Sequence, residues 1–265
     1  SRLYSLAREF VWLFGKWKTK ELDKFIDDFN ADVVFAPIYP TVYMGRIQRY
    51  IIKKTRKPVV SYIADDNYTY AACEKSFISL LHRIWLRKYV RFIIKNSKKV
   101  FVIAPKQKDE YDRIFGIDSE ILTKGTDFSN LSYEPKQVSN PIKMVYTGKL
   151  IIGRWKSLAL MAEAMGKIND KGNRIELDIY TTDTVNEQQK ALLNRNGCSI
   201  KGALKLDEVL EVQKQADILV FVESLDIKYC RVARLSFSTK ITDYLTNGKC
   251  IFAVGNADIA PMDYF

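Results

Sequence analysis

Short runs of β-branched residues alternate with helical patterns along the whole 265-residue sequence. This order is typical of parallel β-sheets covered by helices, so the sequence predicts an α/β fold. The predicted strands are 31–38, 57–65, 98–105, 120–125, 142–150, 174–182, 198–204, 216–223 and 249–255. The predicted helices lie near 3–29, 41–54, 74–96, 106–115, 156–171, 185–196, 206–215 and 239–247.

The alternation pauses once, at residues 127–141, where Ser, Asn and Pro accumulate and apolar periodicity is lost. We therefore expect a linker there and two domains of ordinary size, 1–134 and 135–265. The first domain begins with a helix and has about four strands, and the second ends just after a strand. A doubly wound domain usually has five or six strands, so we expect a chain truncated at both ends, with an incomplete N-terminal domain.

The composition excludes some classes of protein and site. Four widely separated cysteines and a single histidine, His82, are too few soft ligands for a zinc site, and we expect reduced thiols in the cytoplasm. No segment reaches the roughly 20 apolar residues that a membrane span needs. The net charge of +11 attracts anions, which include phosphorylated metabolites, anionic lipid and nucleic acid.

A strand, a glycine, a basic loop and a helix follow one another at residues 145–165, around Gly148, Lys149 and Arg154. In α/β proteins this arrangement binds phosphate, because the loop and the helix N-terminus offer N–H donors and the basic side chains neutralise charge. The alternative is an ordinary surface loop with two solvated cations.

A second segment, residues 236–255, combines a hydroxyl-rich turn, a short helix, a glycine stop and an apolar strand. Ser238 or Thr239 is predicted to cap the helix, with its amide groups facing an anion. Asp243 follows one turn later on the same face, where a carboxylate can accept hydrogen bonds from a ribose. The alternative is a capped helix with a solvated aspartate.

Together these segments resemble the donor-binding half of GT-B glycosyltransferases, specifically the retaining glycosyltransferase family 4. Gly148-Lys149-Leu150 and Arg154 reproduce the spacing of the two basic residues that hold the donor diphosphate in that family. Residues 243–251 match its acid, short helix and Gly-Lys turn, and Ser238-Thr239-Lys240 resembles its Pro-Ser-Lys type of turn. The family's other glutamate falls at Leu235, a departure from the pattern.

The resemblance implies two Rossmann-like domains and transfer of a sugar from a UDP- or GDP-linked donor to a hydroxyl group. Lys149 and Arg154 would act catalytically by stabilising charge on the departing phosphate, with no metal and no further cofactor. The donor would contact Gly148, Lys149, Arg154, Gly202, Ala203, Ser238, Thr239, Lys240 and Asp243. The acceptor would be a saccharide or a lipid-linked molecule of bacterial polysaccharide or glycolipid synthesis.

Asp65 and Asp66 follow a predicted strand, where α/β proteins place ligands, and are candidates for the acceptor side. Neighbouring side chains on extended backbone point to opposite sides, so at most one is expected to reach the acceptor. The alternative is a simple turn.

The predicted helix 76–96 carries His82 and several cations among large apolar residues. Such a helix can lie on an anionic membrane, which would place the protein on the inner face of the cell membrane, or it can pack on the sheet with solvated cations. Two rival functions stay open: a module that binds nucleotide sugars without transfer, which Leu235 favours, and nucleic-acid binding. The sequence lacks the usual nucleic-acid-binding motifs, and we expect no such partner.

Overall fold

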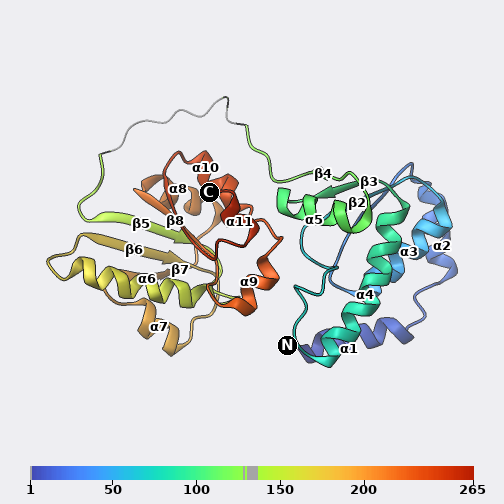
Figure 1. Cartoon of the computed structure of the whole chain (residues 1–265), viewed down its shortest axis with the longest axis horizontal. Helices are drawn as coiled ribbons and strands as arrows, with labels where there is room; N and C mark the ends of the chain where they lie inside the picture. The colour runs from blue at the N-terminus through green and yellow to red at the C-terminus, as the bar shows by residue number, and fades with distance from the viewer. Residues whose placement is uncertain (1, 128, 130–136) are drawn as a thin grey trace. The chain divides into compact units, whose positions relative to one another are not determined.

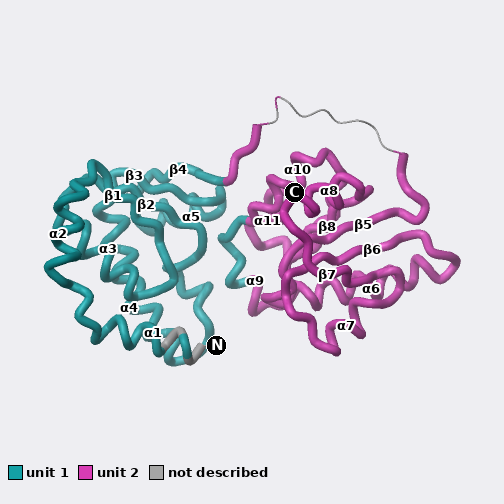
Figure 2. The backbone as a smooth tube through the Cα atoms, turned by 180° about the vertical axis from the view of Figure 1, so that it is seen from behind, with its two compact units in different colours: residues 1–123, 231–237 teal, residues 124–230, 238–265 magenta. Residues whose placement is uncertain are grey.

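The computed structural model describes residues 2–127, 129 and 137–265, which form two compact units. Unit 1 comprises residues 1–123 and 231–237, and unit 2 comprises residues 124–230 and 238–265 (Figure 2). The expected boundary between residues 134 and 135 lies outside the described residues. The assignment of 231–237 to unit 1 corrects the expectation of two consecutive domains, because this short segment packs with residues far from it in sequence.

Unit 1 is built on a sheet of four parallel strands in the order β1-β2-β3-β4, so successive strands are neighbours. Each connection between them runs through a helix: α3, α4 and α5 in turn. Helices α3 and α4 pack against each other. The elements are α1 (Arg2–Phe14), α2 (Lys20–Phe29), β1 (Val34–Pro37), α3 (Val42–Thr55), β2 (Val59–Ile63), α4 (Phe77–Asn96), β3 (Ser97–Val102), α5 (Pro105–Phe115) and β4 (Glu120–Ile121).

Local chemistry explains where these helices start. The hydroxyl of Thr19 accepts a hydrogen bond from the N–H of Leu22, which begins α2 and divides the single predicted helix 3–29 into two. Ser76 caps α4 in the same way through the N–H of Ser79. The strands of unit 1 bury alternate side chains, as in β2, where the exposed fractions of Val59 and Ile63 are below 3%.

Unit 2 is a sheet of five parallel strands in the order β7-β6-β5-β8-β9. Helices α6 and α7 lie on one face of this sheet and α8 and α10 on the other (Figure 1). The elements are β5 (Ile142–Thr147), α6 (Arg154–Asn169), β6 (Ile175–Tyr180), α7 (Glu187–Leu193), β7 (Cys198–Gly202), α8 (Leu206–Gln215), β8 (Ile218–Val222), α9 (Ile227–Ala233), α10 (Lys240–Thr246), β9 (Cys250–Val254) and α11 (Ala260–Asp263).

The strand order of unit 2 reverses direction between β5 and β8. From β5 the chain builds β6 and β7 outward on one side, and then returns to add β8 and β9 on the other. In a parallel sheet such a reversal leaves a crevice at the carboxyl ends of the two central strands, where ligands bind. All nine predicted strands are present, whereas α9 and α11 were not predicted, and α11 corrects the expectation that no helix follows the last strand.

Segment 231–237 belongs to unit 1 because its side chains complete that unit's interior. Leu235 is fully buried in the apolar core formed by the strands and helices of unit 1. Arg234 donates hydrogen bonds to Glu110 of α5 and to Asp66, which follows β2. A buried leucine and a partly buried arginine with two carboxylate partners together anchor the segment.

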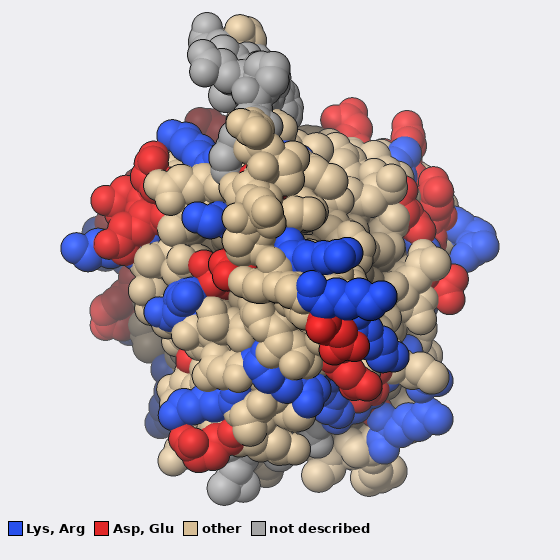
Figure 3. All heavy atoms as spheres, turned by 90° about the vertical axis from the view of Figure 1, so that its left-hand side faces the viewer, with Lys and Arg blue, Asp and Glu red and all other residues tan. Residues whose placement is uncertain are grey.

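Among the described residues, no helix is long and apolar enough to cross a membrane. The net positive charge does not form one continuous patch on the face seen in Figure 3, where groups of Lys and Arg lie next to Asp and Glu.

Candidate functional site

The candidate site of unit 2 lies at the crevice between the carboxyl ends of β5 and β8. Gly148 follows β5 directly, and Glu223 follows β8. Arg154 opens α6, the helix that follows the loop after β5. The sequence predicted Gly148 and Arg154 as site residues but did not predict Glu223.

Arg154 and Glu223 form a paired, largely buried contact. The Nε of Arg154 donates to Glu223 Oε2 at 3.1 Å, and its Nη2 donates to Oε1 at 2.8 Å. Glu223 is 4% exposed, and its backbone carbonyl accepts a hydrogen bond from Ser157 Oγ. Burial lowers the pKa of Arg154 and its bonds to Glu223 raise it, with a net increase, so the guanidinium stays charged. The two-pronged geometry fixes its orientation and leaves its other N–H groups available.

Lys240, at the start of α10, is the second cation of the crevice. Its Nζ lies so close to Gly148 that it would clash with a β-carbon built on that glycine. The same ammonium lies over the ring of Tyr146, 5.0 Å from the centroid. It makes no hydrogen bond or ion pair within the described part of the chain. A side chain at position 148 would therefore displace the ammonium of Lys240.

The environment of Lys240 disfavours its charge. Burial is the main cause that lowers its pKa, from 10.5 to about 8, and the positive charge of Arg154 lowers it further. Glu223 and Asp183 act in the opposite direction. A partly buried lysine with a lowered pKa and no ion-pair partner among the described residues is a candidate for binding an anion.

The loop after β5 is held by side chains of its own unit. The carboxylate of Asp183 accepts hydrogen bonds from the N–H groups of Leu150, at 2.6 Å, and Ile151, at 3.3 Å. The hydroxyl of Tyr146 donates to the carbonyl of Lys149 at 2.7 Å. A protein carboxylate thus occupies two of the loop N–H groups, which corrects the expectation that they would be free for a phosphate. The side chain of Lys149 is exposed and has no partner among the described residues.

The turn before α10 differs from its expected capping geometry. Thr239 is the N-cap residue, but its side chain makes no capping hydrogen bond, and it has helical rather than extended dihedral angles. The carbonyl of Ser238 instead accepts the N–H of Ile241. The structure therefore gives Ser238 and Thr239 no side-chain role in starting the helix.

Asp243 is already paired within unit 2. Its carboxylate forms an ion pair with Lys124, whose carbonyl also accepts a hydrogen bond from Thr242. The pair is partly exposed, at 38% for the aspartate and 45% for the lysine. A ribose hydroxyl at this carboxylate would share it with Lys124.

Gly202 and Ala203 lie at the same carboxyl edge of the sheet but at its outer strand. Gly202 ends β7, which is separated from β5 by β6, so they lie about 10 Å along the edge from Gly148. Gly202 has a φ of +93°, and its carbonyl accepts the N–H of Thr181. Gly148, Arg154 and Lys240 are thus brought together, whereas Gly202 and Ala203 stand apart from them.

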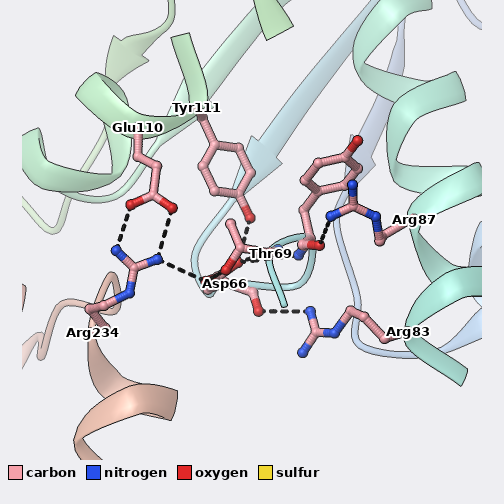
Figure 4. A network of polar contacts seen from close by, with 8 residues as sticks. Asp66, Thr69, Arg83, Arg87, Glu110, Tyr111 and Arg234 are labelled. Atoms are coloured by element: carbon pink, nitrogen blue, oxygen red, sulfur yellow. Dashed lines mark hydrogen bonds and ion pairs between the residues drawn. The ribbon is translucent and has the colours of Figure 1, made fainter. Parts of the chain in front are cut away.

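Asp66 of unit 1 is a buried structural acceptor (Figure 4). Its carboxylate is fully inaccessible and accepts hydrogen bonds from the N–H groups of Tyr68 and Thr69, the hydroxyls of Thr69 and Tyr111, and Arg234. With its lone pairs occupied, it cannot meet an acceptor hydroxyl, which corrects the expectation for this residue. Asp65 points elsewhere: it is exposed and accepts a hydrogen bond from Ser236 Oγ at 2.6 Å.

The described residues contain no group of three or more His, Cys, Asp or Glu side chains placed to hold a metal ion.

No family model matches the sequence, and comparison with curated proteins gives no match. Solved structures do resemble the chain. A glycosyltransferase from Rickettsia africae ESF-5 is 16% identical, with a TM-score of 0.59 over 88% of this chain and 60% of that chain. The lipopolysaccharide outer core galactosyltransferase WaaB is 13% identical, with a TM-score of 0.57 over 96% and 64%. The pneumococcal O-GlcNAc transferase GtfA, solved with UDP and GlcNAc, is 12% identical, with a TM-score of 0.56 over 88% and 44%.

These similarities establish the fold. The chain has two parallel sheets flanked by helices, the GT-B architecture of these glycosyltransferases. It spans about half to two thirds of the length of the neighbours it matches.

Proposed function

We propose that the protein is a glycosyltransferase that moves a sugar from a UDP- or GDP-linked donor to a hydroxyl group. The observation that carries this proposal is the pair of cations, Arg154 and Lys240, at the switch point of unit 2 beside Gly148. One is oriented by a buried carboxylate, and the other is a partly buried ammonium with no anionic partner. A diphosphate would give Lys240 the anionic partner that it lacks among the described residues.

The chemistry follows from where charge develops. When the bond between the sugar carbon and the phosphate oxygen breaks, negative charge grows on the leaving diphosphate. Donors already oriented toward that position stabilise it without reorganisation, and they do so best where water is largely excluded. Arg154 and Lys240 would supply this stabilisation, with Lys149 at the exposed rim. The acceptor oxygen forms the new bond to the sugar carbon and gives its proton to the departing diphosphate or to water.

Other features of the proposal rest on the family resemblance. We propose retention of configuration at the sugar, no requirement for a metal, and a cytoplasmic protein that meets the inner face of the membrane. The acceptor would be a saccharide or a lipid-linked saccharide of bacterial polysaccharide or glycolipid synthesis. The galactosyltransferase role in the name of WaaB and the UDP bound to GtfA support this assignment by analogy of fold.

Thermal denaturation with UDP, GDP and CMP tests the site. A nucleotide at a hundred times its dissociation constant adds about 2.7 kcal/mol to the free energy of unfolding. We expect UDP or GDP to stabilise the protein, and we expect Arg154→Ala to lose most of that gain. Gly148→Ala should lose it too, because the new methyl group displaces the Lys240 ammonium. The matched control is Gly125→Ala, where a β-carbon meets nothing within 4 Å. Equal stabilisation in all three variants would refute the site.

A module that binds nucleotide sugars without transfer is the second candidate. The observation that favours it is Leu235, which stands where the resembled family has a glutamate and is buried in unit 1. Incubation with a panel of UDP- and GDP-sugars and saccharide acceptors separates the two functions. A transferase releases nucleoside diphosphate in proportion to glycosylated product, whereas the binding module shows stabilisation without turnover.

A further inference from the structure

Unit 1 contains a groove that the proposed donor site does not explain. Two adjoining cavities, of about 550 and 320 Å³, share the lining residues Glu9, Ile78 and His82. Both lie within unit 1, between α1, the start of α3 and the first half of α4. Their volumes are in the range of small-molecule sites. The shared residues make them one groove with two chemically different ends.

The larger cavity forms the polar end of the groove, at the carboxyl edge of the sheet of unit 1. Thr41 follows β1, and Ser76 lies on the connection that follows β2, as does Asp65. The hydroxyl oxygen of Thr41 is buried and has no hydrogen-bond partner in the described part of the chain. An orphaned hydroxyl lining a cavity is a donor that a ligand or a water molecule can satisfy.

The polar end has two arginines, Arg8 and Arg83, that form no ion pair among the described residues. Arg8, His82 and Arg83 line it, against the carboxylates of Glu9 and Glu74. The carboxylate of Glu9 is already used, because it accepts the N–H groups of Val42, at 3.0 Å, and Tyr43, at 3.1 Å, and thereby caps α3. His82 Nε2 lies 3.7 Å from Glu9. The carboxylate nearest His82, that of Glu9, is thus already hydrogen-bonded to the N-terminus of α3.

The smaller cavity forms the apolar end. Its walls include Phe10 and Leu13 of α1 and Phe77, Leu81 and Trp85 of α4. These side chains are unusually exposed for their size: 64% for Phe10, 73% for Phe77 and 49% for Trp85. Large apolar side chains gathered around a concave surface mark a binding site for an apolar group.

We propose that this groove binds an anionic amphiphile with a single hydrocarbon chain, its head at Arg8 and His82 and its chain between α1 and α4. The polar end lies at the same sheet edge as the exposed Asp65, so a lipid carried here would present its head group where an acceptor is expected. The suggestion that this lipid carries the acceptor rests on the proposed function. The proposal that the groove binds an anionic amphiphile does not depend on it.

Calorimetric titration with alkyl phosphates below their critical micelle concentrations tests the proposal. Each added methylene buried in the groove tightens binding by up to about fourfold, so dodecyl phosphate should bind up to about two orders of magnitude more tightly than octyl phosphate. Leu81→Glu places a charge in the apolar end and should weaken dodecyl phosphate at least tenfold. Leu80→Glu is the matched control, because Leu80 has a similar exposed fraction on the same helix and does not line the groove.

A second comparison tests the anionic head. Dodecyl maltoside has the same chain and a neutral head, and it should bind more weakly than dodecyl phosphate. Arg8→Gln combined with His82→Gln should reduce the affinity for the phosphate toward that for the maltoside. Four results would each overturn the proposal. They are no binding, an affinity that does not depend on chain length, equal affinity for the two head groups, and equal losses of affinity in the Leu80 and Leu81 variants. Binding only to anionic vesicles, with equal losses in both variants, would show a flat membrane-binding face instead.

The donor site provides an independent reference. Leu81→Glu should keep the stabilisation by UDP or GDP, because the variant lies in the other unit. If alkyl phosphates bind but no nucleotide does, the groove stands and the proposed function fails. If a nucleotide binds but alkyl phosphates do not, the groove proposal fails alone.

Discussion

Replacing Lys240 with methionine should stabilise unit 2 at neutral pH while removing a cation of the site. Burial and Arg154 lower the pKa of Lys240 from 10.5 to about 8, a difference of 10.5 minus 8, or about 2.5 units. Each unit is worth 1.36 kcal/mol, so keeping the ammonium charged in the folded state costs about 3 kcal/mol. A methionine of similar length has no such cost.

The pH dependence follows from the sign of this shift. Between pH 8 and pH 10.5 the unfolded chain binds more protons at Lys240 than the folded chain does, so the contribution of this group to stability rises with pH. The penalty is complete below about pH 8. The variant should therefore gain about 3 kcal/mol in free energy of unfolding at pH 7 and only about 1.4 kcal/mol at pH 9.5.

Urea denaturation followed by tryptophan fluorescence measures this gain in one unit. Trp155 lies in unit 2, whereas Trp12, Trp17 and Trp85 lie in unit 1 and are replaced by phenylalanine so that only Trp155 reports. The exposed Lys149→Met is the matched control and should change stability by no more than about 0.5 kcal/mol. If Lys240→Met destabilises unit 2, or its gain is the same at both pH values, Lys240 is not a partly buried cation whose charge the fold disfavours.

Three further outcomes are expected. Leu235→Ala should lower the free energy of unfolding of unit 1 by about 2–5 kcal/mol, since Leu235 is fully buried there; the 44% exposed Leu225→Ala should have little effect, and a loss confined to unit 2 would contradict the placement of segment 231–237. Glu223→Gln should destabilise unit 2 by about 3–5 kcal/mol because it leaves the buried Arg154 unpaired; exchanging both residues for methionine should restore most of the loss, and a persistent defect would argue against the pair as its cause. Affinity for UDP or GDP should fall about tenfold between pH 7 and pH 9 as Lys240 loses its proton, and this slope should vanish in Lys240→Met.

Strands and long helices were predictable from the sequence because they depend on local periodicity. Most of the strands are short runs rich in apolar residues between polar turns, and each strand appears close to its expected position. The shortest is β4, which has only two exposed residues of the predicted 120–125. Helix α9 has only seven residues and carries little periodicity of its own, so its pattern did not distinguish it from a loop. Segment 231–237 was missed for a related reason: the partners that bury Leu235 lie more than a hundred residues away in sequence.

The sequence predicted the basic residues of the site but not the carboxylates that contact them. Gly148 and Arg154 follow a strand in a pattern that local sequence reveals. Glu223 and Asp183 meet them only once the sheet has formed, because they follow β8 and β6. A usable signal was present in Glu223, an acid directly after a fully apolar strand, which is where a parallel sheet delivers residues to its ligand edge. The pairing of Asp243 with Lys124 likewise joins residues 119 positions apart.

The path of the chain limits how the two units can be produced as separate fragments. The backbone passes from one unit to the other after residues 123, 230 and 237, so no single cut separates the two units. A C-terminal fragment that starts at residue 124 would contain Arg234 and Leu235 but not the residues of unit 1 that they contact. The exposed leucine and the unpaired arginine would then favour self-association. An isolated donor-binding unit should instead be made with residues 231–237 replaced by a short Gly/Ser bridge, which keeps the connection and removes the orphaned side chains.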